Sequence, residues 1–135
     1  MAKIVLNDLK DLGNIPVGER LLRFTAFMEK TGQAGTYAQL EFKVDDDSEY
    51  KGRKATLNSS YSDNSRWVLK RNLLVLGATE DDVNDPSGID PAEMFPALVG
   101  NVCIGVFVAN SYENKAGKTV NGSKLGSIKA TEEWS

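Results

Sequence analysis

Residues 22–44 read LRFTAFMEKTGQAGTYAQLEFKV, and this stretch indicates the fold class. Each half alternates apolar and polar residues, which is typical of a strand with one buried face. The two apolar sets are Leu22, Phe24, Ala26 and Met28 in the first half and Ala38, Leu40, Phe42 and Val44 in the second. Between them, residues 31–35 carry two glycines and predict a hairpin loop. We therefore expect two antiparallel strands whose inner faces are these apolar sets.

The chain that follows changes from strand-like to helical spacing. After an acidic turn, residues 51–58 predict a third strand. Residues 62–77 then read SDNSRWVLKRNLLVLG, with cap-forming residues at the start and Gly77 at the end. This pattern predicts a helix over residues 65–76. Its Trp67 has apolar neighbours and is expected to pack into the core.

The rest of the chain supplies a short helix and two more strands. Residues 78–89 are acidic and loop-like, and Asp90, followed by proline, predicts the start of a short second helix. A fourth strand over residues 101–109 is apolar on both faces, so it is expected at the centre of the sheet. A long loop over residues 110–122 and a fifth strand over residues 123–131 complete the prediction.

Five strands with a helix between the third and the fourth is the plan of the OB-fold, a small, partly open Greek-key barrel. We therefore expect an all-β fold with one main helix. The length fits a single domain over residues 1–135, with its core at about residues 18–131. An unrelated five-stranded barrel and a small sandwich are the alternatives.

Composition limits the function classes. Charged residues interrupt the N-terminal stretch, so we expect no secretion signal, and the sequence holds no apolar run long enough to span a membrane. We therefore expect a cytoplasmic location, in the host cell if the protein is viral, and no membrane partner. There is no histidine, and the one cysteine, Cys103, lies in an apolar run. Because the usual nucleophile–base pairs and metal ligands are then scarce, we expect no enzyme activity, catalytic residue, metal or cofactor. A carboxylate-dependent nuclease is the enzymatic alternative.

The charges are unevenly distributed along the chain, whose net charge is −3. Residues 51–71 carry six basic side chains against one acid, whereas acidic side chains gather in residues 45–49 and 80–93. Segregated charge can present a basic surface on an acidic protein.

The outward faces of the strands provide the candidate binding site. If the apolar sets point inward, aromatic and basic residues of the first two strands must point outward. Such a mixture suits single-stranded nucleic acid, because bases stack on rings and cations pair with phosphates. The third strand and the loop after the fourth add further residues of both kinds. We expect bases to stack on Phe27, Tyr37 and Tyr112, and phosphates to be neutralised by Arg23, Lys43, Arg53, Lys54, Lys115 and Lys118.

Several short motifs add a resemblance to a known family. They are PVGE (residues 16–19), YKGRK (residues 50–54), WVLKRNL (residues 67–73), LGA (residues 76–78) and LVGNV (residues 98–102). Over about residues 18–131 the chain resembles the OB-fold single-stranded DNA-binding proteins encoded by tailed bacteriophages. The resemblance implies largely sequence-independent binding of single-stranded DNA during phage DNA replication or recombination, with proteins of those processes as partners.

A different class of function competes with this interpretation. The same exposed aromatics would serve a protein-interaction or structural module, such as a virion component or an inhibitor of a host enzyme. The sequence leaves the oligomeric state open, a homo-oligomer included.

Overall fold

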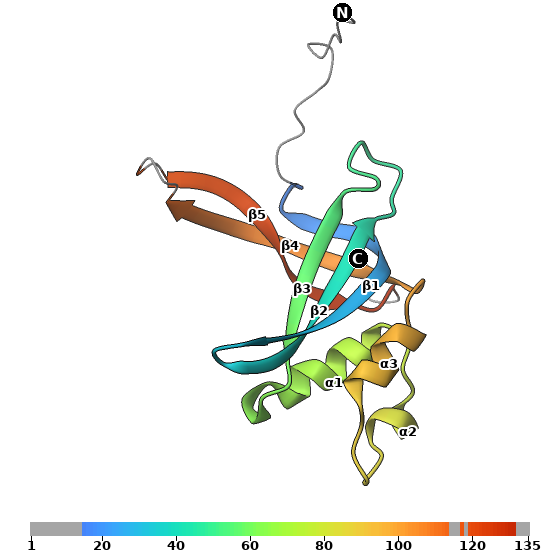
Figure 1. Ribbon diagram of the computed structural model, residues 1–135. Helices are drawn as coiled ribbons and strands as arrows, with labels where there is room; N and C mark the ends of the chain where they lie inside the picture. The colour runs from blue at the N-terminus through green and yellow to red at the C-terminus, as the bar shows by residue number, and fades with distance from the viewer. Residues whose placement is uncertain (1–14, 114–116, 118, 132–135) are drawn as a thin grey trace, which may run out of the picture.

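The computed structural model describes residues 15–113, 117 and 119–131. In chain order its elements are β1 (Gly18–Gly32), β2 (Gly35–Val44), β3 (Lys54–Ser60), the 3-10 helix η1 (Asp63–Ser65), α1 (Arg66–Val75), α2 (Glu80–Val83), α3 (Pro91–Ala97), β4 (Val102–Glu113) and β5 (Thr119–Lys129) (Figure 1). The strands form one antiparallel five-stranded sheet in the order β3-β2-β1-β4-β5. Within the described residues no ladder joins β3 to β5, so the sheet is curved but not closed. The predicted OB-like, mostly-β fold with its main helix between the third and fourth strands is confirmed.

The core fills the concave side of the sheet and is covered at one end by helices. Its largest inaccessible side chains come from three strands, from α1 with the residue that follows it, and from α3: Leu22, Phe24, Leu40, Phe42, Ile128, Leu73, Leu76 and Phe95. Figure 1 shows α1 and α3 lying together beneath the barrel, where their apolar sides close it. Each fully buried side chain of this size stabilises the fold by roughly 1.5–3 kcal/mol. The sheet's other side is therefore the one left to face solvent.

A bulge in β1 changes which residues reach the core. Phe24 pairs with Phe42, but the next pair is Ala26 with Glu41, so Thr25 is an extra residue. A bulge of this kind reverses the alternation of the residues that follow it. The predicted orientation is therefore right for Leu22 and Phe24 but wrong beyond Thr25. Met28 is 56% exposed, whereas Phe27 stacks on Phe95 with ring centroids 5.4 Å apart.

The main helix, α1, has the predicted position, but its Trp67 is exposed and not buried as predicted. α1 buries Leu69, Leu73 and the following Leu76, which recur at helical spacing. Trp67 precedes Leu69 by two positions, about 200° around the helix axis. It therefore faces away from the core and is 69% exposed, so its predicted burial is wrong.

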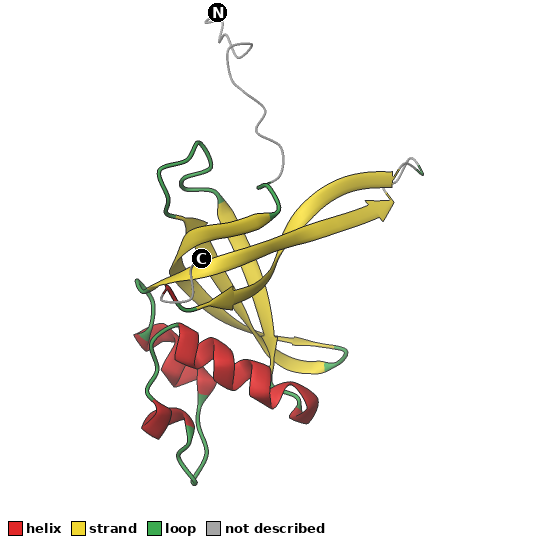
Figure 2. Ribbon diagram, turned by 180° about the vertical axis from the view of Figure 1, so that it is seen from behind, coloured by secondary structure: helices red, strands yellow, loops and turns green. Residues whose placement is uncertain are grey.

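Three other predicted boundaries differ from the structure. β3 begins three residues later than predicted because residues 49–52 form a turn, in which Gly52 has a φ of +87°. The predicted loop over residues 110–122 is largely strand, since β4 and β5 continue as a two-stranded ribbon beyond the barrel (Figure 2). The predicted acidic loop over residues 78–89 contains the short α2.

The second predicted helix is confirmed as α3, with Asp90 accepting a hydrogen bond from the Ala92 amide at 3.0 Å. No helix in the described part of the chain is long and apolar enough to cross a membrane.

Candidate nucleic-acid interface

The solvent side of β1, β2 and β3 forms a continuous surface, which we call the outer face. Residues that pair directly across neighbouring strands point to the same side of a sheet. Four rows of the outer face follow from the strand registers: Lys30–Tyr37–Ser60, Met28–Gln39–Asn58, Ala26–Glu41–Thr56 and Arg23–Lys43–Lys54. The rows begin beside the β1–β2 turn and end beside the β2–β3 loop. From Tyr37 to Lys43 the face is about 20 Å long, at the usual rise of a strand.

Tyr37 is the aromatic residue of this face. Its neighbour Ala38 is fully buried and Tyr37 is half-buried, so its predicted outward orientation is confirmed. A hollow of about 180 Å³ lies beside the ring, and its lining residues are Ala34, Gly35, Tyr37, Asn58 and Ser60. The hollow therefore combines one ring with amide and hydroxyl groups next to the β1–β2 turn. Phe27, expected beside Tyr37, pairs with Leu40 and lies on the opposite, core-facing side.

The cations of the outer face differ in how strongly they are tied to the protein. Lys43 is exposed, and within the described residues no ion pair involves it. Lys54 is 69% exposed and its Nζ lies 3.3 Å from a Glu41 carboxylate oxygen, an exposed contact that holds the side chain only weakly. Arg23 is tied more firmly, because its guanidinium donates to Asp45 at 2.8 Å and to the Gly100 carbonyl at 2.6 Å. Lys43 and Lys54 are therefore the cations best placed to meet an anion.

The remaining predicted site residues lie elsewhere or outside the description. Arg53 precedes β3 and is half-buried beside the edge of that strand. The backbone of Tyr112 pairs with Val120 in the β4–β5 ribbon. Lys115 and Lys118 lie outside the described residues. The structure thus brings Tyr37, Lys43 and Lys54 onto one face, and it places Phe27 in the core.

The sequence does not identify several residues of the outer face. Alternation places Ala26 and Met28 in the core, and it gives no role to Lys30, Asn58 and Ser60. Their position follows from the bulge at Thr25 and from the pairing register, and neither leaves a mark in the alternation of the sequence. The Thr25 hydroxyl donates to the Glu41 carbonyl at 3.1 Å, which ties the extra residue to β2.

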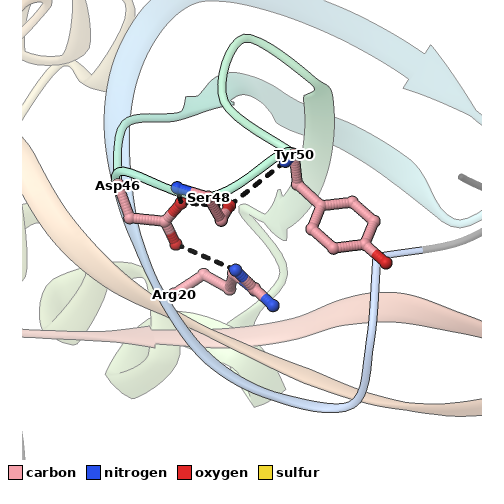
Figure 3. Close-up of polar contacts among 4 residues, drawn as sticks. All are labelled: Arg20, Asp46, Ser48 and Tyr50. Carbon is pink, nitrogen blue, oxygen red and sulfur yellow. Dashed lines mark hydrogen bonds and ion pairs between the residues drawn. The ribbon is translucent and has the colours of Figure 1, made fainter.

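Two of the four carboxylates in the acidic turn after β2 pair with arginines of β1, Asp45 with Arg23 and Asp46 with Arg20. Figure 3 shows Asp46 between Ser48 and Arg20, whose guanidinium lies 3.2 Å from the carboxylate and 4.9 Å from the centre of the Tyr50 ring. Burial raises the pKa of Asp46, but hydrogen bonds from Ser48 and the charge of Arg20 outweigh burial, so the pKa lies below its ordinary value. The turn is thus folded onto the end of the barrel. The two paired carboxylates therefore help to hold the turn in place.

Groups that could carry chemistry are few in the described structure. Cys103 is fully buried, and burial raises the pKa of its thiol to about 12. Among the described residues no three His, Cys, Asp or Glu side chains gather as ligands for a metal ion. The absence of enzyme activity, of a metal and of a cofactor stays a prediction.

Comparison with known proteins adds no identification. No family model matches the chain, and no curated protein matches it. The fold and the outer face are therefore the observations from which a function can be argued.

Proposed function

We propose that this protein binds single-stranded DNA on its outer face, with little sequence preference. The observation that carries the proposal is Tyr37, an outward-facing ring beside a base-sized hollow on the same strand as the exposed Lys43. Stacking a base on an aromatic ring contributes about 1–3 kcal/mol and tolerates any base. A face about 20 Å long suits the short sites of several nucleotides that single OB-folds cover.

The cations would contribute the part of the affinity that depends on salt. Lys43 and Lys54 pair in register on neighbouring strands, so their ammonium groups emerge side by side. Phosphates neutralised by lysine release counterions, and each such contact on a single strand adds about 0.7 to the salt slope. Glu41, the acid of this face, is partly neutralised by Lys54. Replication or recombination of phage DNA is the setting that the family resemblance implies, and it belongs to the same proposal.

The direct test is the affinity of the purified protein for fluorescently labelled oligo-dT, measured by anisotropy against duplex DNA and RNA of equal length. We expect oligo-dT to bind more tightly than the duplex, with an affinity that falls steeply as salt rises. Equal and weak binding of all three nucleic acids would contradict the proposal.

The role of Tyr37 is tested by two variants of that residue. Tyr37→Ala removes the ring and is expected to weaken oligo-dT binding about tenfold, because 1–3 kcal/mol of stacking is lost. Tyr37→Phe keeps the ring and should bind like the wild type. Unchanged oligo-dT affinity in a normally folded Tyr37→Ala protein would mean that no base stacks on Tyr37.

A protein-interaction module is the second candidate, and one observation favours it. A groove of about 700 Å³ runs between α1 and the loops around α2, with Trp67 on its rim and Leu69, Val83 and Ile89 among its lining. Residues 80–93 beside it carry six acids and no base. The lining of the groove itself is balanced in charge, with Arg66 and Lys70 besides Asp63 and Asp85. The partner that fits is therefore a protein segment with an exposed apolar side chain. Trp67→Ala should abolish such binding and leave oligo-dT affinity unchanged.

A further inference from the structure

The open seam of the barrel carries a second group of cations. β3 and β5 are the two edge strands, and they pack against each other without a described ladder between them. A hollow of about 260 Å³ lies in this seam. Edge strands present a row of backbone N–H and C=O groups that no neighbouring strand uses. The seam is therefore a polar cleft between two sheet edges.

The charges that line the seam are all positive. Its lining residues are Ile15, Arg53, Lys54, Ala55, Thr56, Phe107, Ser123, Lys124 and Leu125. Lys54 and Lys124 are exposed and stand on opposite walls, one on each edge strand. The bottom of the hollow is formed by Ala55, Phe107 and Leu125, which are packed in the core. No acid is among these lining residues, although the whole chain has a net charge of −3.

Like charges gathered around a small hollow repel one another unless an anion lies between them. The hollow of about 260 Å³ could hold several water molecules at about 30 Å³ each. This volume suits one phosphate group with part of its hydration shell, and it is too small for a further β-strand. Lysine ammonium groups bind phosphate as point charges and can do so from two sides. Arg53 already interacts within the protein, so the argument rests on the two lysines. Of these, Lys54 lies 3.3 Å from a Glu41 carboxylate oxygen, an exposed contact that holds the side chain only weakly and that a phosphate can replace.

We propose that the seam binds one phosphate group between Lys54 and Lys124. The source of that phosphate rests on the proposed function. In single-stranded DNA it is a backbone phosphate, reached where the strand leaves the outer face over Lys54 and enters the seam. The alternative source of the same chemistry is free phosphate or pyrophosphate.

The variant that isolates the seam is Lys124→Gln, because Lys124 lies on β5 and takes no part in the outer face. Lys124→Arg keeps the charge and should behave like the wild type, and Lys70→Gln on the exposed side of α1 is the matched control. None of these side chains belongs to the core, so all three variants should melt like the wild type. Pyrophosphate titrated into ¹⁵N-labelled protein is expected to shift the amides of Thr56, Lys124 and Leu125 saturably. Lys124→Gln should weaken that binding about tenfold.

The DNA arm of the experiment separates the two proposals. In oligo-dT binding, Lys124→Gln should lower the salt slope by about 0.7, the loss of one phosphate contact, and Lys70→Gln should leave it unchanged. A pyrophosphate response without oligo-dT binding supports the seam site with a free phosphate as ligand and overturns the proposed function. The seam site is overturned if the wild type shows no pyrophosphate response and Lys124→Gln binds oligo-dT normally with an unchanged salt slope. The proposed function would then still stand.

Discussion

Replacing Phe27 tests the bulge that decides which side of β1 faces the ligand. Truncating a buried phenylalanine to alanine costs about 3–5 kcal/mol. Phe27 is only partly buried but stacks on Phe95, an aromatic pair worth about 0.5–1.5 kcal/mol beyond its buried area. We therefore expect Phe27→Ala to lower the free energy of unfolding by about 2–3 kcal/mol. With a urea m-value of about 1.5 kcal/mol/M for a chain of this size, the denaturation midpoint should fall by about 1.5 M.

The neighbouring Met28→Ala is the matched control for this experiment. Met28 is 56% exposed on the outer face, so its truncation should change the unfolding free energy by less than about 0.5 kcal/mol. Oligo-dT affinity, measured where each protein is fully folded, should be unchanged in Phe27→Ala. A Phe27→Ala protein of wild-type stability with reduced DNA affinity would contradict the placement of Phe27 on the core side of β1. It would mean that Phe27 faces the ligand, as simple alternation predicts.

Three other predictions concern the core. Gly105→Ala should destabilise the fold by about 1–3 kcal/mol, because a Cβ there would lie 2.3 Å from Leu22 Cδ1; thermal unfolding followed by circular dichroism measures this. Asn72→Ala leaves the buried Ser59 hydroxyl without its 3.1 Å partner and should cost about 1–3 kcal/mol, and adding Ser59→Ala should restore part of the loss in urea denaturation. Burial raises the pKa of the Cys103 thiol to about 12, so above about pH 9 the folded state keeps a proton that the unfolded state loses. The free energy of unfolding should therefore fall as pH rises above about 9. A thiol reagent should react quickly with Cys103 only in denaturant.

The sequence predicted the order of elements well because each depends on local chemistry. Alternation in β2 places Leu40 and Phe42 in the core, Gly77 with its φ of +116° ends α1, and the Asp90 cap begins α3. The failures come from long-range geometry. The bulge at Thr25 is set by pairing with β2, and the burial of α1 is set by which side of the helix meets the sheet. For the same reason Tyr37 was oriented correctly and Trp67 was not.

The register of β1 against β2 decides the candidate site as well. Arg23, Lys43 and Lys54 lie in one row, yet only pairing with Asp45 reveals that Arg23 is held by the fold. The seam could not be predicted from the sequence, because Lys54 and Lys124 are brought to one hollow by the curvature of the sheet, which brings its two edge strands together.

Binding of single-stranded DNA on the outer face is tested most directly by titrating ¹⁵N-labelled protein with oligo-dT and following each amide signal. We expect the largest shifts on the outer face, at Tyr37, Gln39, Lys43 and Asn58, and unchanged signals on the exposed side of α1 around Trp67. Shifts confined to α1 and the groove beside it, with no shift on the outer face, would show that the outer face is not the DNA-binding surface.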